Sequence, residues 1–115
     1  MRKLKDELEL YLGAYYSEAP VDATYPYNVF DIEVTSKNDN KYNAILEVNV
    51  WDKNKYYSRA EAEADKIEHL LDGAISLSDD VLFYCFDGSR QHVLDEDKQI
   101  KRIRMQFELY FYERS

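Results

Sequence analysis

The chain has 115 residues, of which 45% are hydrophobic and 33% charged, and its formal net charge is −8. This length favours one domain spanning residues 1–115, and the acidic balance argues against a surface that grips nucleic-acid phosphates. The single cysteine excludes an internal disulfide and favours a reducing, cytoplasmic origin, while the lack of a long apolar segment leads us to expect neither a signal peptide nor a membrane span.

The first predicted element is an amphipathic helix near the N-terminus. Leu4, Leu8, Tyr11, Leu12 and Tyr15 recur at steps of three and four residues. That spacing places them in one apolar stripe of three to four helical turns. The segment 17–24, which contains a proline, is predicted to be a connecting loop.

Two strands joined by a hairpin are predicted next. Residues 25–27 read Tyr-Pro-Tyr and lead into an extended segment, because proline keeps its predecessor out of the helical region. Residues 29–34 then alternate between apolar and polar types, as one strand with one apolar face does. The polar stretch 36–41 is predicted to be the hairpin tip, and residues 43–51 form the second strand.

The second helix has the clearest start signal. Ser58 and Glu61 have the spacing of a capping box, in which each side chain binds a backbone N–H of the first turn. Gly73 suits the C-terminal end. The predicted apolar stripe consists of Ala60, Ala64, Ile67, Leu71 and Ala74.

Two further strands complete the prediction. Residues 81–86 are continuously apolar, which predicts a strand covered on both faces. Asp87 and Gly88 indicate a turn or bulge, residues 95–97 a charged connection, and residues 102–112 a long alternating strand. The sequence therefore predicts an α+β fold in the order α-β-β-α-β-β, with a four-stranded antiparallel sheet of two hairpins and both helices on one face.

No combination of residues indicates catalysis. His69 and His92 lack the additional ligands of a metal site, and no glycine-flanked nucleophile accompanies them. The acidic run 95–97 lacks the glycine and spacing of a calcium loop. We therefore expect a protein that is not an enzyme, with no catalytic residues and no cofactor or metal.

Charge and aromatic side chains point to contacts with proteins. Residues 60–97 contain eleven acids and two bases, a local charge of −9, and the remainder carries +1. Tyrosine and tryptophan are enriched at interfaces, although ordinary packing explains such rings equally well. The candidate interface residues are Trp51, Tyr56, Tyr57, Asp95, Glu96, Asp97, Lys98, Lys101, Arg102, Arg104, Tyr110 and Tyr112.

The ordered features resemble the tail terminator, or tail completion, proteins of long-tailed phages. The resemblance covers about residues 4–112. After the amphipathic helix, it rests on the aromatic-proline-aromatic entry 25–27 and the strand 46–51 that ends in Trp51. It continues with the alanine- and acid-rich helix start 59–65 and the acidic connection before the last strand.

This resemblance implies a structural protein of a phage or prophage. Members of the family form rings, typically hexameric, at the head-proximal end of the tail. The ring stops polymerisation of the tail-tube protein and docks with the head connector, and DNA passes through its lumen without sequence-specific binding. The resemblance thus implies assembly in the host cytoplasm, a final place in the tail or neck of the virion, and subunits that are monomers or oligomers when isolated.

Two hypotheses on charge follow from this reading. The acidic stretch 60–97 and the basic cluster from Lys98 to Arg104 would face each other between neighbouring subunits or face axial partners. Some surplus acid would line the lumen, where like charge lets DNA slide. Two alternative functions are a head-closure or connector adaptor of the same neck region and, in a different class, an acidic DNA-mimicking inhibitor of a DNA-binding enzyme.

Overall fold

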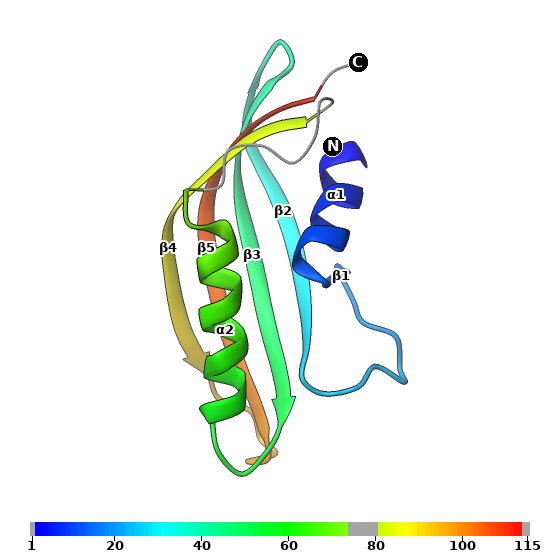
Figure 1. Cartoon of the computed structure of the whole chain (residues 1–115), viewed down its shortest axis with the longest axis vertical. Coiled ribbons are helices and arrows are strands. Elements are labelled where there is room, and N and C mark those ends of the chain that lie inside the picture. The colour runs from blue at the N-terminus through cyan, green and yellow to red at the C-terminus, as the bar shows by residue number, and fades with distance from the viewer. Residues whose placement is uncertain (1, 74–80, 114–115) are drawn as a thin grey trace.

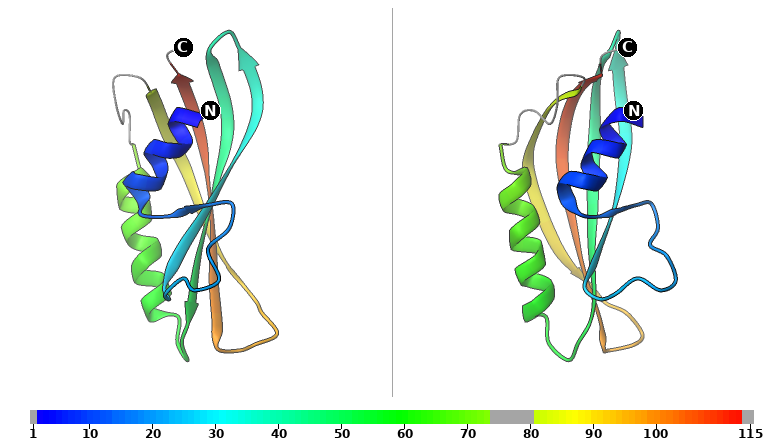
Figure 2. Two further views of the ribbon diagram at one scale, coloured as in Figure 1. Left: turned by 90° about the vertical axis from the view of Figure 1, so that its right-hand side faces the viewer. Right: turned by 45° about the vertical axis from the view of Figure 1, so that its right-hand side comes forward.

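The computed structural model of the chain describes residues 2–73 and 81–113. The helices are α1 (Arg2–Leu12) and α2 (Ser58–Leu71). The strands are β1 (Tyr15–Tyr16), β2 (Tyr27–Asn38), β3 (Lys41–Lys53), β4 (Val81–Val93) and β5 (Ile100–Glu113). They form one twisted sheet in the order β1-β2-β3-β5-β4, and both helices lie on the same side of it (Figures 1 and 2).

The predicted four-stranded antiparallel sheet is wrong. The sheet has five strands and is mixed, because β1 pairs in parallel with Val29 and Phe30 of β2, and the element order is α-β-β-β-α-β-β. Gly13 explains the difference. Its backbone has φ +61°, so α1 ends at Leu12, and Tyr15 is a strand residue instead of part of the helical stripe.

The strands are longer than the segments that the alternation of side chains predicts. The β2–β3 ladder extends from Tyr27 and Trp51 to Asn38 and Lys41, so the hairpin turn is confined to Asp39 and Asn40. The ladders also contain two register shifts. One lies between Val34 and Ser36, and the other, between Phe86 and Ser89, confirms the predicted irregularity at residues 87–88.

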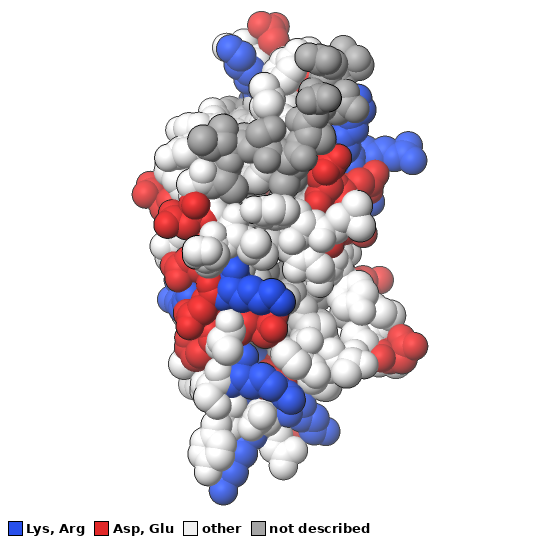
Figure 3. Space-filling view, in the orientation of Figure 1, with Lys and Arg blue, Asp and Glu red and all other residues white. Residues whose placement is uncertain are grey.

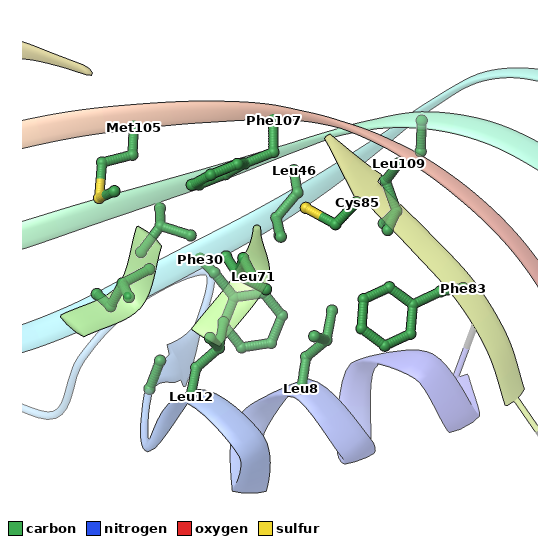
Figure 4. Close-up of a cluster of buried hydrophobic side chains, with 14 of the residues drawn as sticks. Leu8, Leu12, Phe30, Leu46, Leu71, Phe83, Cys85, Met105, Phe107 and Leu109 are labelled. Carbon is green, nitrogen blue, oxygen red and sulfur yellow. The ribbon is translucent and has the colours of Figure 1, made fainter. Parts of the chain in front are cut away.

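The hydrophobic core lies between the sheet and the two helices. Leu4, Leu8 and Leu12 of α1 are all buried, as their four-residue spacing requires. Figure 4 shows Leu8 and Leu12 pointing toward Phe30 and Leu71. The sheet contributes its inward-facing residues, including Ala44, Leu46, Val48, Val50, Ile103, Met105, Phe107, Leu109 and Phe111.

Two long-range contacts fix the helices in place. The carboxylate of Glu113, near the end of β5, accepts a hydrogen bond from the backbone N–H of Leu4 (2.8 Å), and so satisfies one unpaired donor in the first turn of α1. The hydroxyl of Tyr11 donates to the carbonyl of Leu70 (2.8 Å), which links α1 to the end of α2.

The start of α2 differs from the predicted capping box. Tyr57 occupies the N-cap position, and no side chain caps the helix there. Glu61 instead directs its carboxylate to Arg90 and His92 of β4. The bond to the ionised guanidinium of Arg90 is stronger than a bond to a neutral backbone N–H, which explains why the box does not form. Ala74, the last residue of the predicted stripe, lies outside the described residues.

We expect Gly88→Ala to destabilise the fold. A Cβ atom at Gly88 would lie 2.6 Å from Cε1 of Phe107, whose side chain is buried, so the ring would have to shift. Overpacking of this kind typically costs about 1–3 kcal/mol, measurable by urea denaturation. Ser89→Ala, one residue further along the strand, is the matched control, and equal stability of the two variants would contradict the expectation.

Candidate interaction surfaces

The strand register divides the sheet into an inner face under the helices and an outer face. Phe83, Cys85, Leu109 and Phe111 point inward and are buried. Their neighbours in sequence therefore point outward, because side chains alternate along a strand. Among the described residues no helix covers the outer face, as the edge-on view in Figure 2 shows.

The upper part of the outer face carries an exposed aromatic patch, which we define as Leu82, Tyr84, Phe86, Tyr110 and Tyr112. Leu82 lies directly opposite Tyr112, and Tyr84 opposite Tyr110, across the β4–β5 ladder. The exposed fractions are 52% for Leu82, 44% for Tyr84 and 51% for Tyr110. The expectation that residues 81–86 would be covered on both faces is thus wrong for this chain by itself.

The rings of the aromatic patch contact one another. The centroids of Tyr84 and Phe86 are 5.1 Å apart, and those of Phe86 and Tyr110 are 5.0 Å apart. A shallow depression of about 300 Å³ adjoins this surface. It is lined by Leu82, Tyr84, Tyr110 and Tyr112 of the patch and by Lys41, Tyr42, Phe83 and Phe111. A rigid aromatic surface of this kind gains contact area at a low cost in side-chain entropy when a partner covers it.

Below the aromatic patch, charged side chains of the outer face are paired within the chain. The guanidinium of Arg104 lies 3.2 Å from the carboxylate of Glu47 on β3. Arg102 stacks over the ring of Trp51 at 4.9 Å and donates to the side-chain oxygen of Asn49 at 2.9 Å. Both arginines therefore have partners inside the subunit, which reduces the charge that they offer to a neighbour.

The acidic surface of α2 is organised around Arg90 of β4. The guanidinium of Arg90 lies 2.8 Å from Glu61, 2.9 Å from Asp65 and 2.7 Å from Glu68. Figure 3 shows Asp and Glu gathered over this helix, and Lys and Arg toward the lower end of the same face. One cation thus neutralises part of the acidic surface and clamps α2 to the edge strand.

His92 extends this contact toward the start of α2. Its Nε2 contacts the carboxylate of Glu61, and its ring stacks on Tyr57 with centroids 3.9 Å apart. The ammonium of Lys101 lies 5.5 Å from the centre of the Tyr57 ring. The hydrogen bond from His92 and the charge of Arg90 lower the pKa of Glu61 below its ordinary value, although partial burial opposes this.

An ion pair between the buried carboxylate of Asp52 and the half-exposed guanidinium of Arg59 joins the end of β3 to α2. Asp52 is fully buried, and its carboxylate accepts hydrogen bonds from Nε of Arg59 at 3.0 and 3.1 Å. The same carboxylate accepts the backbone N–H of Lys53 at 2.9 Å. The hydrogen bond to Asp52 raises the pKa of Arg59 above its ordinary value, so the guanidinium stays charged.

The fold has a known structural counterpart. It is similar to a chain in a solved structure described as the virion of a native gene transfer agent particle. The two chains share 20% sequence identity with a TM-score of 0.61, over 91% of this chain and 84% of the other. No family model matches the sequence, and no curated protein matches it significantly. At this identity the likeness establishes a shared fold.

The structure distributes the predicted interface residues over three regions. Arg102, Arg104, Trp51, Tyr110 and Tyr112 belong to the outer face. Tyr57 and Lys101 lie together near His92 on the side of the helices, and Tyr56 is 63% exposed in the connection before α2. The remaining four residues, Asp95, Glu96, Asp97 and Lys98, occupy the connection between β4 and β5.

Sequence reasoning missed three of the five residues of the aromatic patch. It predicts that Leu82, Tyr84 and Phe86 belong to a strand covered on both faces, which excludes them as interface candidates. A continuously apolar run does not distinguish a strand covered on both faces from an edge strand with one open face, so the position of β4 at the edge of the sheet is what reveals the patch. The structure also shows no helix long and apolar enough to cross a membrane among the described residues.

We expect the stability contributed by Glu61 to depend on pH. A carboxyl whose pKa is lowered by folding stabilises the protein above its unfolded value, near 4.5, and loses that contribution as the pH falls through the folded value. Glu61→Gln should therefore be less stable than the parent at neutral pH, and the difference in melting temperature should narrow toward about pH 3.

The control for this experiment is Glu63→Gln, which removes the same charge from the same helix without touching His92 or Arg90. Thermal unfolding followed by circular dichroism across the pH range measures both variants. A difference for Glu61→Gln that stays constant with pH would contradict the assignment.

We expect Asp52→Ala to destabilise the fold more than a surface substitution does. It removes an acceptor of three charge-assisted or backbone hydrogen bonds from a fully buried position, which typically costs about 2 kcal/mol. Asp22→Ala in the exposed loop before β2 is the control. Urea denaturation distinguishes the two, and equal midpoints would show that the ion pair contributes nothing.

Proposed function

We propose that this chain is a structural protein of a phage-like virion, and that it acts as a tail terminator or tail completion protein. In this role, copies form a ring, hexameric by the family's pattern, at the head-proximal end of the tail. The ring ends tail-tube polymerisation and joins the tail to the head connector. Assembly would take place in the host cytoplasm, and DNA would pass through the lumen without catalysis.

The exposed aromatic patch carries this proposal. A monomeric protein rarely leaves a contiguous apolar surface without a use, and Leu82, Tyr84 and Tyr110 are about half exposed on one continuous surface. The shared fold with a chain of a gene transfer agent virion supports a role in particle assembly. The resemblance to tail terminators over residues 4–112 supports the specific position in the tail.

The arrangement of charge bears on the alternatives. A DNA mimic presents a continuous acidic surface that imitates phosphates, whereas Arg90 here contacts three carboxylates of α2 and offsets one of their negative charges. The pairing of Arg104 with Glu47 also changes the proposed charge contact between subunits, because reversing that arginine would disturb its own subunit as well. The identity of the binding partner distinguishes a tail terminator from a head-closure adaptor.

The double variant Tyr84→Ser/Tyr110→Ser should lose binding to its virion partner while it keeps the fold. Both rings are exposed at the centre of the aromatic patch, and truncation of such an interface aromatic typically costs about 2 kcal/mol or more, a weakening of about 30-fold. Native mass spectrometry and negative-stain imaging, with the protein alone and mixed with tail-tube or connector subunits, measure the change.

Tyr56→Ser is the matched control, because Tyr56 is 63% exposed but lies away from the patch, in the connection before α2. Binding to tail-tube subunits supports the terminator, and binding only to connector subunits supports the adaptor. A protein that binds neither component, or a double variant that binds as well as the parent, would contradict the proposed function.

A further inference from the structure

Within the part of the chain that the structure describes, both edges of the sheet leave backbone groups without a strand partner. β4 is the last described strand on one side, and its described partner is β5. On the other side, β1 pairs only with Val29 and Phe30 of β2, so within residues 2–73 and 81–113 no strand lies beside β2 from Asp31 onward. Unpaired edges of this kind accept further strands readily.

The upper half of β4 lacks the features by which proteins usually protect an edge. Residues 81–86 contain no charged residue, proline or glycine. Among the described residues, the backbone N–H of Gly73 donates a hydrogen bond to the carbonyl of Cys85 in this half (3.3 Å). On β2, the side chain of Val34 is 40% exposed beside the free edge. Both edges therefore have backbone N–H and C=O groups available for pairing with a further strand.

The directions of the strands determine which copies can pair. β2 is antiparallel to β3, β3 to β5, and β5 to β4, so β2 and β4 of one chain run in opposite directions. A second copy that is related by rotation about an axis along the strands keeps the same orientation. Its β2 would therefore meet the β4 of the first copy as an antiparallel pair, the commoner arrangement in sheets.

This geometry fits a second copy of the chain better than a foreign strand. Each subunit has one free β2 edge and one free β4 edge, so a closed head-to-tail ring satisfies both edges with a single type of contact. Pairing of β4 with β4 through a two-fold axis would instead leave every β2 edge open.

We propose that the free edge of β2, from Asp31 to Val34, pairs with β4 of the next copy and continues the sheet from subunit to subunit. The proposal rests on the proposed function for the closure of the ring, and it names the contact that holds the ring together. The register shift after Val34 limits the pairing segment of β2, and the shift after Phe86 divides β4 into two segments.

Cysteine cross-linking tests the contact directly. Glu33→Cys marks the free edge of β2, and Leu82→Cys, Tyr84→Cys and Gln91→Cys mark three heights along β4, all at exposed positions on the outer face. The native Cys85 does not interfere, because burial raises the pKa of its thiol to about 12. Tyr110→Cys is the control. Tyr110 is exposed beside Tyr84 on the outer face, but it belongs to β5, which is not an edge strand because it lies between β3 and β4.

The variants, each with one introduced cysteine beside the native Cys85, are mixed in pairs at millimolar concentration, oxidised and separated under non-reducing conditions. The expected result is a disulfide-linked dimer between Glu33→Cys and at least one β4 variant, with far less product for Glu33→Cys with the Tyr110→Cys control. A β4 variant that links chiefly to itself, a control that reacts as strongly, or protein that remains monomeric at this concentration would overturn the proposal.

The cross-linking experiment and the binding experiment on the proposed function can fail independently. Rings that bind tail-tube subunits but give no link between β2 and β4 would refute the contact and leave the function standing. Linked oligomers that bind neither tail-tube nor connector subunits would refute the function and leave the contact standing.

Discussion

The structure depends on a sheet that buries only one of its faces. Alternation along β3 and β5 places Leu46, Val48, Met105 and Leu109 against α1 and α2, and these contacts form the single core. The same alternation forces Tyr84, Tyr110 and their neighbours onto the opposite side, where the described residues provide no helix. Residues 2–73 and 81–113 contain two helices, and both pack on the inner face. We propose that another molecule covers the outer face.

Charged residues serve mainly to hold this one-sided arrangement together. Arg90 joins β4 to three carboxylates of α2, Asp52 and Arg59 join β3 to the start of the same helix, and Glu113 joins β5 to α1. Because these groups have partners inside the subunit, fewer individual charges are available for specific contacts between subunits, although the net charge of −8 is unchanged. The uncharged aromatic patch and the free strand edges are thus better candidates for specific assembly than the opposite-charge patches.

Much of the local structure was predictable from the sequence. The full length of the strands and the long-range ion pairs between the sheet and the helices were not. The stripes of α1 and α2 and the alternation of β5 marked the core, since periodicity reports directly which side chains are buried. β1 was missed because a strand of two residues is too short to show an alternating pattern of side chains. The polar end of β2 was missed because main-chain pairing requires no apolar side chain. The Arg90 contacts join residues 22 to 29 positions apart, which no local spacing reveals. The composition drew attention to Tyr110 and Tyr112, but only the edge position of β4 shows that Leu82 and Tyr84 belong with them.

The central claim is that another protein covers the outer face in the assembled particle. Hydroxyl-radical footprinting with mass spectrometry tests it most directly, because it reports the solvent access of individual tyrosine rings without any substitution. The account predicts that Tyr84 and Tyr110 are labelled in the free chain and protected in the assembled ring or in its complex with tail subunits, while Tyr56 is labelled in both. Equal labelling of Tyr84 and Tyr110 in the free and assembled states would contradict the account.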